Sequence, residues 1–312
     1  MGLYIILVNY NSSSDTIDCV YSLLKSTIKD FCIIIVDNSD DESHILKIKE
    51  VFQHEKIILF NETDSLHHEL NENKIICIKQ NENKGFASAN NLGIDYVMRQ
   101  DQKNAILLLN NDTIVEENAI ENLINEYKQR GQNNCYTGKI FYYDNRNYIW
   151  YDGGAINYLT GKVKHIGFNR LGPGNNTIKK TDFITFCYVL IPINVIKKIG
   201  KLNEGYFMYY EDVDYCYKCK KNSIPMIQIP SSVIYHKVGM SSGGSLSEFS
   251  AYYSYKNEIR FNLQRSDVLK YLSLLIIITK RLVIALRWLL RGKKKFSYIS
   301  LITIKDALRN VR

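Results

Sequence analysis

The chain has 312 residues, of which 46% are hydrophobic and 23% charged, and this composition excludes an intrinsically disordered protein. Its length fits one large α/β domain, or one domain with a smaller appendage. The net charge is +8 at pH 7, but the excess is concentrated near the C-terminus, where basic residues alternate with Leu, Ile and Trp between Lys280 and Lys295. This arrangement disfavours nucleic-acid binding and favours contact with an anionic membrane surface.

The seven cysteines predict neither a zinc site nor a disulfide framework. Cys216 and Cys219 have Cys-x-x-Cys spacing, but no second pair or nearby histidine completes a zinc site. Several others lie in apolar runs, where a free thiol behaves as a small hydrophobe. The apolar, strand-like run at residues 3–8 is too short for a signal peptide and lacks the charged flank of one. We therefore expect a cytoplasmic protein.

The first half of the chain alternates short β-branched runs with amphipathic helical patterns. Strands are predicted at residues 3–8, 32–36, 75–78 and 105–109, and helices at 15–28, 43–52 and 87–98. This alternation predicts a mostly parallel, doubly wound sheet. The polar run 61–74 interrupts it and is expected to be a surface insertion.

The second half predicts short strands followed by helices. Strands are expected at 136–143, 148–157, 162–168 and 182–191, and a helix at 192–199 with proline in its permitted first turn. Another helix should begin near Glu211, a Gly/Ser-rich loop covers 238–247, and the pattern is helical from Phe249 onward. We therefore expect a catalytic domain at 1–248 and a helical C-terminal region at 249–312.

Polar residues follow three of the predicted strands at one edge of the sheet. In an open parallel sheet, ligands bind beyond the carboxyl ends of the strands. Any one segment alone could be an ordinary turn, but three in register indicate a ligand site. The segments are Asn9-Tyr10-Asn11, Asp37-Asn38-Ser39 and Asn110-Asn111-Asp112-Thr113.

No glycine-rich dinucleotide motif or P-loop lysine follows the first strand, which disfavours dinucleotide-binding and ATP-hydrolysing folds. Instead, Lys84 and Gly85 follow the third strand and lead into a helix that contains Asn90. A flexible glycine at a helix N-terminus is a suitable neighbour for a diphosphate.

Four segments together resemble glycosyltransferase family 2, and most of all its rhamnosyltransferase-like branch. They are VDNSD, NKGFASANNLG, LLLNNDT and YYEDVDYCYK, and they occur in the family's order between residue 3 and about residue 262. The resemblance implies an α/β, GT-A (nucleotide-diphospho-sugar transferase) fold, with a Rossmann-like, mostly parallel sheet and a C-terminal helical extension.

The resemblance also implies roles for matching residues. The family's Asp-x-Asp metal motif maps onto residues 110–112, where only Asp112 is acidic. One carboxylate, with diphosphate oxygens and waters, would suffice for Mg²⁺ or Mn²⁺, and His236 is expected to contact the metal or diphosphate.

In the Glu211-Asp212 motif, Asp212 is the expected general base; the alternative is that these acidic residues only stabilise a helix N-terminus. The donor is expected to contact Asn9, Tyr10, Asp37, Lys84, Gly85, Asn90, Asn111, Asp112 and Glu211.

Three further features have a functional and a structural interpretation. Gly153, Gly154 and Asp182 would shape the sugar and acceptor side, or serve as turn and strand-edge residues. The pattern Tyr252-Tyr253-x-x-Lys256-Asn257 resembles the branch's C-terminal helix motif, for which we favour packing on the catalytic domain. Residues 269–290 are apolar but interrupted by Lys280, Arg281 and Arg287, which predicts an interfacial helix with Trp288 and a cationic tail at 291–295 rather than a spanning helix. A helical hairpin packed on the protein or on a second subunit is the alternative.

We therefore expect an inverting, metal-dependent hexosyltransferase that uses a dTDP- or UDP-sugar, with L-rhamnose as the first guess. Its acceptor would be a cell-surface polysaccharide or lipid-linked glycan at the inner face of the cell membrane, and its cofactor Mg²⁺ or Mn²⁺. A sugar nucleotidyltransferase is an alternative, but residues 9–14 lack the glycine-rich basic loop of that class. A non-catalytic nucleotide-sugar-binding protein is another, against which Asp112, Asp212 and His236 count.

Overall fold

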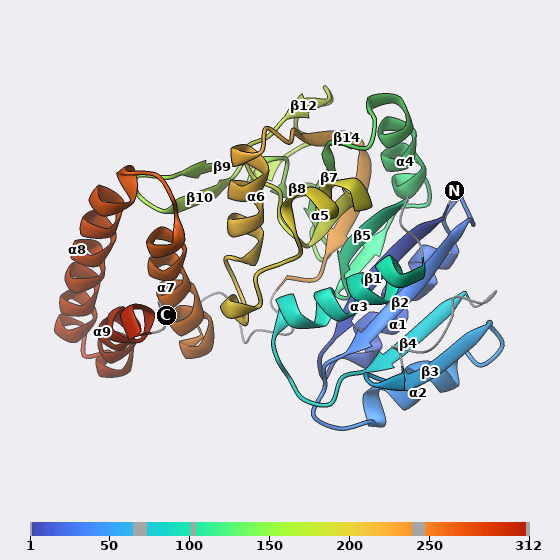
Figure 1. The fold of residues 1–312 in the computed structure, drawn as a ribbon, viewed down its shortest axis with the longest axis horizontal. Coiled ribbons are helices and arrows are strands. Elements are labelled where there is room, and N and C mark those ends of the chain that lie inside the picture. Colours follow the sequence, from blue (N-terminus) through green and yellow to red (C-terminus); the bar gives the residue numbers. More distant parts are fainter. Residues whose placement is uncertain (1, 65–73, 101–103, 239–246, 310–312) are drawn as a thin grey trace.

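The computed structural model describes residues 2–64, 74–100, 104–238 and 247–309, and its centre is a large mixed sheet (Figure 1). The strand order is β11-β8-β7-β13-β5-β1-β2-β4-β3. All four strands predicted in the first half are present, and β3 was not predicted. The parallel strands are β1 (Leu3–Asn9), β2 (Phe31–Asp37), β3 (Ile57–Asn61), β4 (Ile75–Lys79) and β5 (Ala105–Asn110).

The path of the chain places helices on both faces of these parallel strands. From β1 the chain moves outward through α1 (Ser13–Leu24) and α2 (Ser43–Val51), and α3 (Phe86–Gln100) carries it back to β5 on the other side of β1. Because strand crossovers are right-handed, the return helix must lie on the opposite face from the outward helices. Accordingly, α1 contacts α2, whereas α3 packs against β1 and β2 in front of the sheet (Figure 1). The reversal between β1 and β5 is the switch point at which such sheets bind ligands.

The second half extends the sheet with antiparallel strands. Here β13 (Tyr188–Pro192) pairs with β5, and β14 (Met226–His236) pairs with β7 and with β6. The remaining strands are β6 (Thr113–Val115), β7 (Cys135–Tyr142), β8 (Tyr148–Tyr151), β11 (Arg170–Leu171) and β12 (Lys179–Lys180), with β9 (Gly154–Asn157) and β10 (Lys162–His165) forming a separate hairpin. The helices here are α4 (Ala119–Arg130), α5 (Ile193–Ile199), the 3₁₀ turn η2 (Glu204–Tyr206) and α6 (Glu211–Lys221).

Three of the predicted strands are shorter than expected or broken, and the one predicted at 162–168 ends at His165. The predicted strand at 148–157 is broken into β8 and β9 at Gly153, where φ is +89°. The apolar run 182–191 forms a strand only from Tyr188 onward. Phe183 forms only an isolated antiparallel bridge to Gly154, and residues 184–187 are buried without strand pairing. An apolar run in the sequence does not distinguish a strand from a buried irregular segment.

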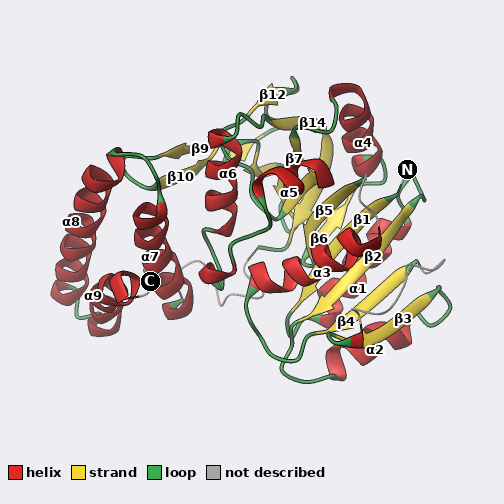
Figure 2. Ribbon diagram, in the orientation of Figure 1, coloured by secondary structure: helices red, strands yellow, loops and turns green. Residues whose placement is uncertain are grey.

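Three C-terminal helices form an all-helical group beside the sheet (Figure 2). They are α7 (Glu248–Gln264), α8 (Leu269–Leu290) and α9 (Lys294–Arg309). Phe261 of α7 belongs to the main hydrophobic core, whereas Ile259 packs with Ile277 and Ala307 in a small second core. Among the residues placed by the structure, no helix is long and apolar enough to cross a bilayer.

A buried ion pair joins α7 to α8. Glu258 is almost completely buried, and its carboxylate pairs with the Arg281 guanidinium and, at 3.0 Å, with Lys280 Nζ. The Arg281 guanidinium also lies 3.6 Å from the ring centroid of Tyr255. The expectation that Arg281 belongs to an outward-facing cationic surface is therefore wrong, because the protein itself neutralises this charge.

Removal of the Glu258 charge should destabilise the protein. Glu258→Gln leaves the Arg281 charge buried without its counter-ion, and breaking such a pair costs about 3–5 kcal/mol. Urea unfolding followed by circular dichroism would measure the loss. Glu248→Gln is the matched control, since Glu248 on the same helix forms an exposed pair with Lys295 and such pairs contribute at most about 1 kcal/mol. Equal midpoints for the two variants would contradict a stabilising role for the buried pair.

Candidate active site

A buried network of polar side chains joins the ends of three strands. Asn9 Nδ2 donates to Asp37 Oδ1 at 2.6 Å and to Ser39 Oγ at 3.2 Å. Thr16 Oγ1 donates to Asn9 Oδ1 at 2.7 Å, and Asn111 Nδ2 donates to Thr16 Oγ1 at 2.9 Å. The network thus brings Asn9, Asp37 and Asn111 together at the sheet edge where the sequence predicts a ligand site.

Asp37 keeps one carboxylate oxygen available within this network. Its side chain is fully buried, and Lys79 Nζ lies 3.4 Å from Oδ2. Within the described structure Oδ2 accepts no hydrogen bond. A buried acceptor without a donor is costly, so this oxygen is suited to a donor group on a ligand.

Gly85 lies where two backbone segments approach closely. A Cβ atom at this position would lie 2.2 Å from the carbonyl oxygen of Phe207, and φ is +93°. The same carbonyl accepts a hydrogen bond from the backbone N–H of Phe86 at 2.7 Å. Only glycine fits here, because any side chain would collide with backbone. The structure therefore gives Gly85 a packing role, in addition to the diphosphate contact predicted from the sequence.

Asp112 and His236 form a buried pair at the end of β14. His236 pairs with Thr113 in the antiparallel register of β14 and β6, and Lys237 N donates to the Asp112 carbonyl at 2.9 Å. As a result, His236 Nε2 lies 3.1 Å from Asp112 Oδ1. The Trp150 ring stands edge-on to the His236 ring, with centroids 4.7 Å apart.

These two side chains fit a divalent cation as a partial ligand set. Asp112 Oδ1 and His236 Nδ1 are buried, and the structure gives the Asp112 oxygen no hydrogen-bonding side chain other than His236 Nε2 among the described residues. Among the described residues, no third His, Cys, Asp or Glu side chain joins these two as a potential metal ligand. Burial disfavours the imidazolium, but Cys187 and the Asp112 carboxylate favour it more, and the net effect raises the pKa of His236. A cation would replace that proton between the two side chains.

Glu211 and Asp212 begin α6 directly after a turn with left-handed backbone. Tyr209 and Tyr210 have φ of +66° and +77°. Glu211 is buried and Asp212 half-buried. Burial raises the pKa of both carboxyls, and the nearby Asp212 charge raises that of Glu211 further. A carboxylate with a raised pKa is a stronger base, which suits the predicted role of Asp212.

The irregular segment before β13 connects the acidic pair to the histidine. Burial raises the pKa of the Asp212 carboxyl, and backbone hydrogen bonds lower it, chiefly that of Val213 N at 2.8 Å and to the least extent that of Phe186. The next side chain, Cys187, lies beside His236. The general-base candidate and the metal-ligand candidates are therefore separated by one short buried segment. Sequence analysis predicted a strand here and missed Phe186 and Trp150, because no motif marks either residue.

Three other residues predicted to contact the sugar donor make no side-chain contact with the Asn9–Asp37 network. Tyr10 is exposed, and Lys84 pairs with Glu62 and Glu82 at 3.8 and 3.6 Å. The side chain of Asn90 is turned toward its own helix, where Nδ2 donates to the Phe86 carbonyl at 2.9 Å. Their predicted contacts with the donor remain predictions.

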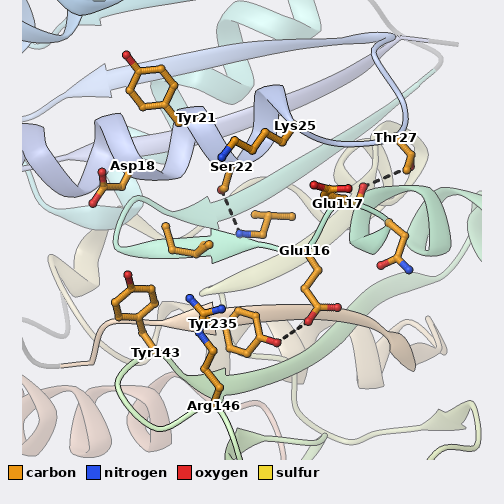
Figure 3. Close-up of a pocket in the computed structure, with 13 residues that line it drawn as sticks. Asp18, Tyr21, Ser22, Lys25, Thr27, Glu116, Glu117, Tyr143, Arg146 and Tyr235 are labelled. Carbon is orange, nitrogen blue, oxygen red and sulfur yellow. Dashed lines mark hydrogen bonds between the residues drawn. The ribbon is translucent and has the colours of Figure 1, made fainter.

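A surface pocket of about 880 Å³ is lined by residues of α1, β6 and β14 and of the loop after β7 (Figure 3). Successive side chains of a strand point to opposite faces, so Tyr235 lines this pocket while His236 meets Asp112. Figure 3 shows the Tyr235 hydroxyl bonded to Glu116, with Arg146 beside the Tyr235 ring. None of the predicted site residues lines the pocket.

Comparisons with known proteins agree with these features. Residues 4–199 match the family model described as glycosyl transferase family 2. The chain is 26% identical over 305 residues to the low-salt glycan biosynthesis hexosyltransferase Agl10 of Haloferax volcanii, which covers 96% of this chain and 87% of that protein. It is 26% identical over 202 residues to glycosyltransferase GlyG of Streptococcus pneumoniae serotype 4, covering 64% of this chain and 57% of that protein.

Two solved structures share the fold. GalNAc-T7, crystallised with UDP, GalNAc and Mn²⁺, matches with a TM-score of 0.65 and 16% identity over 86% of this chain. S. aureus TarS matches with a TM-score of 0.51 and 13% identity over 87% of this chain. The chain spans 49% and 41% of those two structures, and identities this low show the fold alone. The predicted GT-A fold is confirmed.

Proposed function

We infer the function from one premise: this chain belongs to glycosyl transferase family 2. The protein is therefore a glycosyltransferase. We propose that it transfers a hexose, with inversion, from a nucleoside diphosphate sugar to a glycan or lipid-linked acceptor. The observation that carries this proposal is the buried Asp112–His236 pair at the end of β14, in which His236 Nε2 lies 3.1 Å from Asp112 Oδ1. L-Rhamnose on dTDP stays our first candidate donor, with UDP-hexoses next.

The residues divide the reaction between the two sides of the anomeric carbon. Asp212 removes the proton from the acceptor hydroxyl while the hydroxyl oxygen attacks the anomeric carbon. The bond from this carbon to the diphosphate breaks on the opposite face, which inverts the configuration. The Asn9–Asp37 network holds the nucleoside, and Asp37 Oδ2, which pairs with Lys79 but accepts no hydrogen bond within the described structure, accepts one from the nucleobase. Asp112 and His236 would hold Mg²⁺ or Mn²⁺, and the bound cation would supply positive charge against the leaving diphosphate.

We further propose that α8 docks on the inner face of an anionic membrane. The outward face of the helix carries a row of exposed apolar residues without a charged member, namely Tyr271, Leu272, Leu275, Leu282, Val283, Leu286, Leu289 and Leu290. An exposed apolar patch of this kind is typical of a protein or membrane contact.

The charge distribution favours the membrane over a second copy. Residues 266–312 hold eleven basic and two acidic residues, whereas residues 1–265 hold 29 basic and 30 acidic residues. Arg291, Lys293, Lys294 and Lys295 follow directly at the end of the apolar row and are exposed. Two copies joined through this region would bring like charges together, whereas anionic lipid would neutralise them.

Asp212→Asn should lower kcat about 10²- to 10⁴-fold and leave donor binding nearly unchanged, because the variant keeps the shape but cannot accept the proton. Transfer would be assayed with dTDP-L-rhamnose and UDP-hexoses, and donor binding by calorimetry. Asp214→Asn is the control, since Asp214 lies in the same helical turn and pairs with Lys218. Equal losses in both variants would mean that the acidic residues only stabilise the start of α6.

Chelation with EDTA should abolish transfer, and Mn²⁺ or Mg²⁺ should restore it. Asp112→Ala should weaken nucleoside diphosphate binding measured with Mn²⁺ and leave binding measured in EDTA unchanged, because the variant lacks only a metal ligand. Asp144→Ala, an exposed carboxylate, serves as the control. Full transfer activity in EDTA would remove the metal from the mechanism.

The full-length protein should sediment with anionic vesicles at low salt and partly dissociate at high salt, since salt screens the attraction. Replacing Lys293, Lys294 and Lys295 by Gln should weaken binding up to about 100-fold, because each lysine near an anionic surface contributes about 1 kcal/mol. Leu275→Gln with Leu282→Gln should also weaken it. The control replaces three exposed lysines elsewhere, Lys47, Lys49 and Lys128.

Two outcomes would contradict the membrane proposal. One is the absence of vesicle binding at low salt, and the other is an equal loss of binding in the control. If the leucine variant instead converts a dimer into a monomer in solution and vesicles have no effect, α8 is a contact between two copies of the chain.

A further inference from the structure

The side chain of Asn257 on α7 donates hydrogen bonds to three backbone carbonyls of a single turn. Its Nδ2 lies 2.8 Å from Tyr206 O, 2.8 Å from Met208 O and 2.9 Å from Tyr209 O. Asn257 is completely buried. A side-chain amide with its N–H groups surrounded by carbonyls is fixed in orientation, because the flipped amide would place oxygen against oxygen.

The turn that Asn257 holds has an unusual backbone. Phe207, Tyr209 and Tyr210 have φ of +53°, +66° and +77°, in the left-handed region that glycine prefers. Aromatic residues adopt this conformation only where the surrounding structure enforces it, and such residues concentrate at functional sites. Tyr210 is the residue directly before Glu211 and Asp212, so the turn sets where α6 begins and where its first carboxylates point.

Two other contacts hold the same turn. On the side of the Lys84–Gly85 loop, which is expected to bind the sugar donor, the Phe207 carbonyl accepts a hydrogen bond from Phe86 N at the start of α3. On the other side, the Phe207 ring stacks on Tyr253 of α7, with centroids 5.0 Å apart and planes inclined by 22°. The turn therefore lies between the loop that ends at Gly85 and helix α7. Asn257 is the hydrogen-bonding partner of three of its backbone carbonyls.

We propose that Asn257 is a positioning residue that holds Asp212 in place for proton abstraction. The proposal rests on the function proposed above, in which Asp212 is the base. Asn257 itself touches backbone rather than substrate, so its effect passes through the geometry of the turn. Donor binding depends on the strand-end network and on Asp112, which Asn257 does not contact. Loss of the amide should therefore lower kcat and leave the donor KM nearly unchanged.

The test compares Asn257→Leu with Ile259→Ala in the full-length protein. Leucine has a similar size but no N–H groups, so the three carbonyls lose their donor. Ile259 is buried two residues farther along α7 and packs with Ile277 and Ala307, away from the turn. Its truncation destabilises the helix without removing a hydrogen bond from residues 206–210. Both variants would be assayed below their melting temperatures, with kcat and donor KM measured separately.

We expect Asn257→Leu to lower kcat about 10- to 100-fold, because a displacement of about 1 Å in a catalytic group has an effect of this size. The donor KM should change less than about threefold, and Ile259→Ala should retain near-wild-type kcat. The proposal is overturned if folded Asn257→Leu has wild-type kcat, or if Ile259→Ala loses kcat to the same extent. If Asp212→Asn retains turnover, the assignment of the base fails and the proposal for Asn257 fails with it. An inactive Asp212→Asn beside a fully active Asn257→Leu rejects the positioning role alone.

Discussion

The site depends on one constraint, which is that a carboxylate buried at the end of β2 must be satisfied by hydrogen bonds from neighbouring strand ends. Asp37 is fully buried, and Asn9 and Ser39 donate to the same oxygen of its carboxylate. Thr16 then fixes the Asn9 amide, and Asn111 binds Thr16. This chain of bonds fixes how β2, β1 and β5 end relative to one another, and Asp112 follows directly in the sequence.

The second half of the chain completes the site around this fixed edge. The pairing of β14 with β6 brings His236 to Asp112, and the segment before β13 places Phe186 at Asp212 and Cys187 at His236. The antiparallel strand β14 from the second half therefore brings His236 to Asp112 at the edge of the parallel sheet. The parallel part of the sheet corresponds to the first half of the sequence, where strand and helix patterns alternate, and the antiparallel part to the second half, where short strands precede helices.

The sequence predicts the strand-end residues well, because the carboxyl ends of parallel strands meet at one edge and polar side chains there are easy to recognise. Contacts between distant segments are harder to predict. Asn257 binds carbonyls 48 to 51 residues earlier, and backbone acceptors leave no mark in a sequence. Residues 184–187 show the opposite problem, since their apolar character predicts burial but not the absence of strand pairing. Arg281 shows that a charged residue in a helix is not always exposed, because this arginine is buried and pairs with Glu258.

The adjacent residues Asn257 and Glu258 give α7 two attachments, one to the turn before α6 and one to α8. This arrangement affects how loss-of-function alleles in the last 50 residues should be interpreted. A substitution of Arg281 removes the partner of Glu258, the direct neighbour of Asn257, so it will resemble a defect in catalysis although it lies far from Asp212 in the sequence. Genetic screens that assign such alleles to acceptor or membrane recognition by position alone will therefore misclassify some of them. Assays of turnover on a water-soluble acceptor separate the two classes.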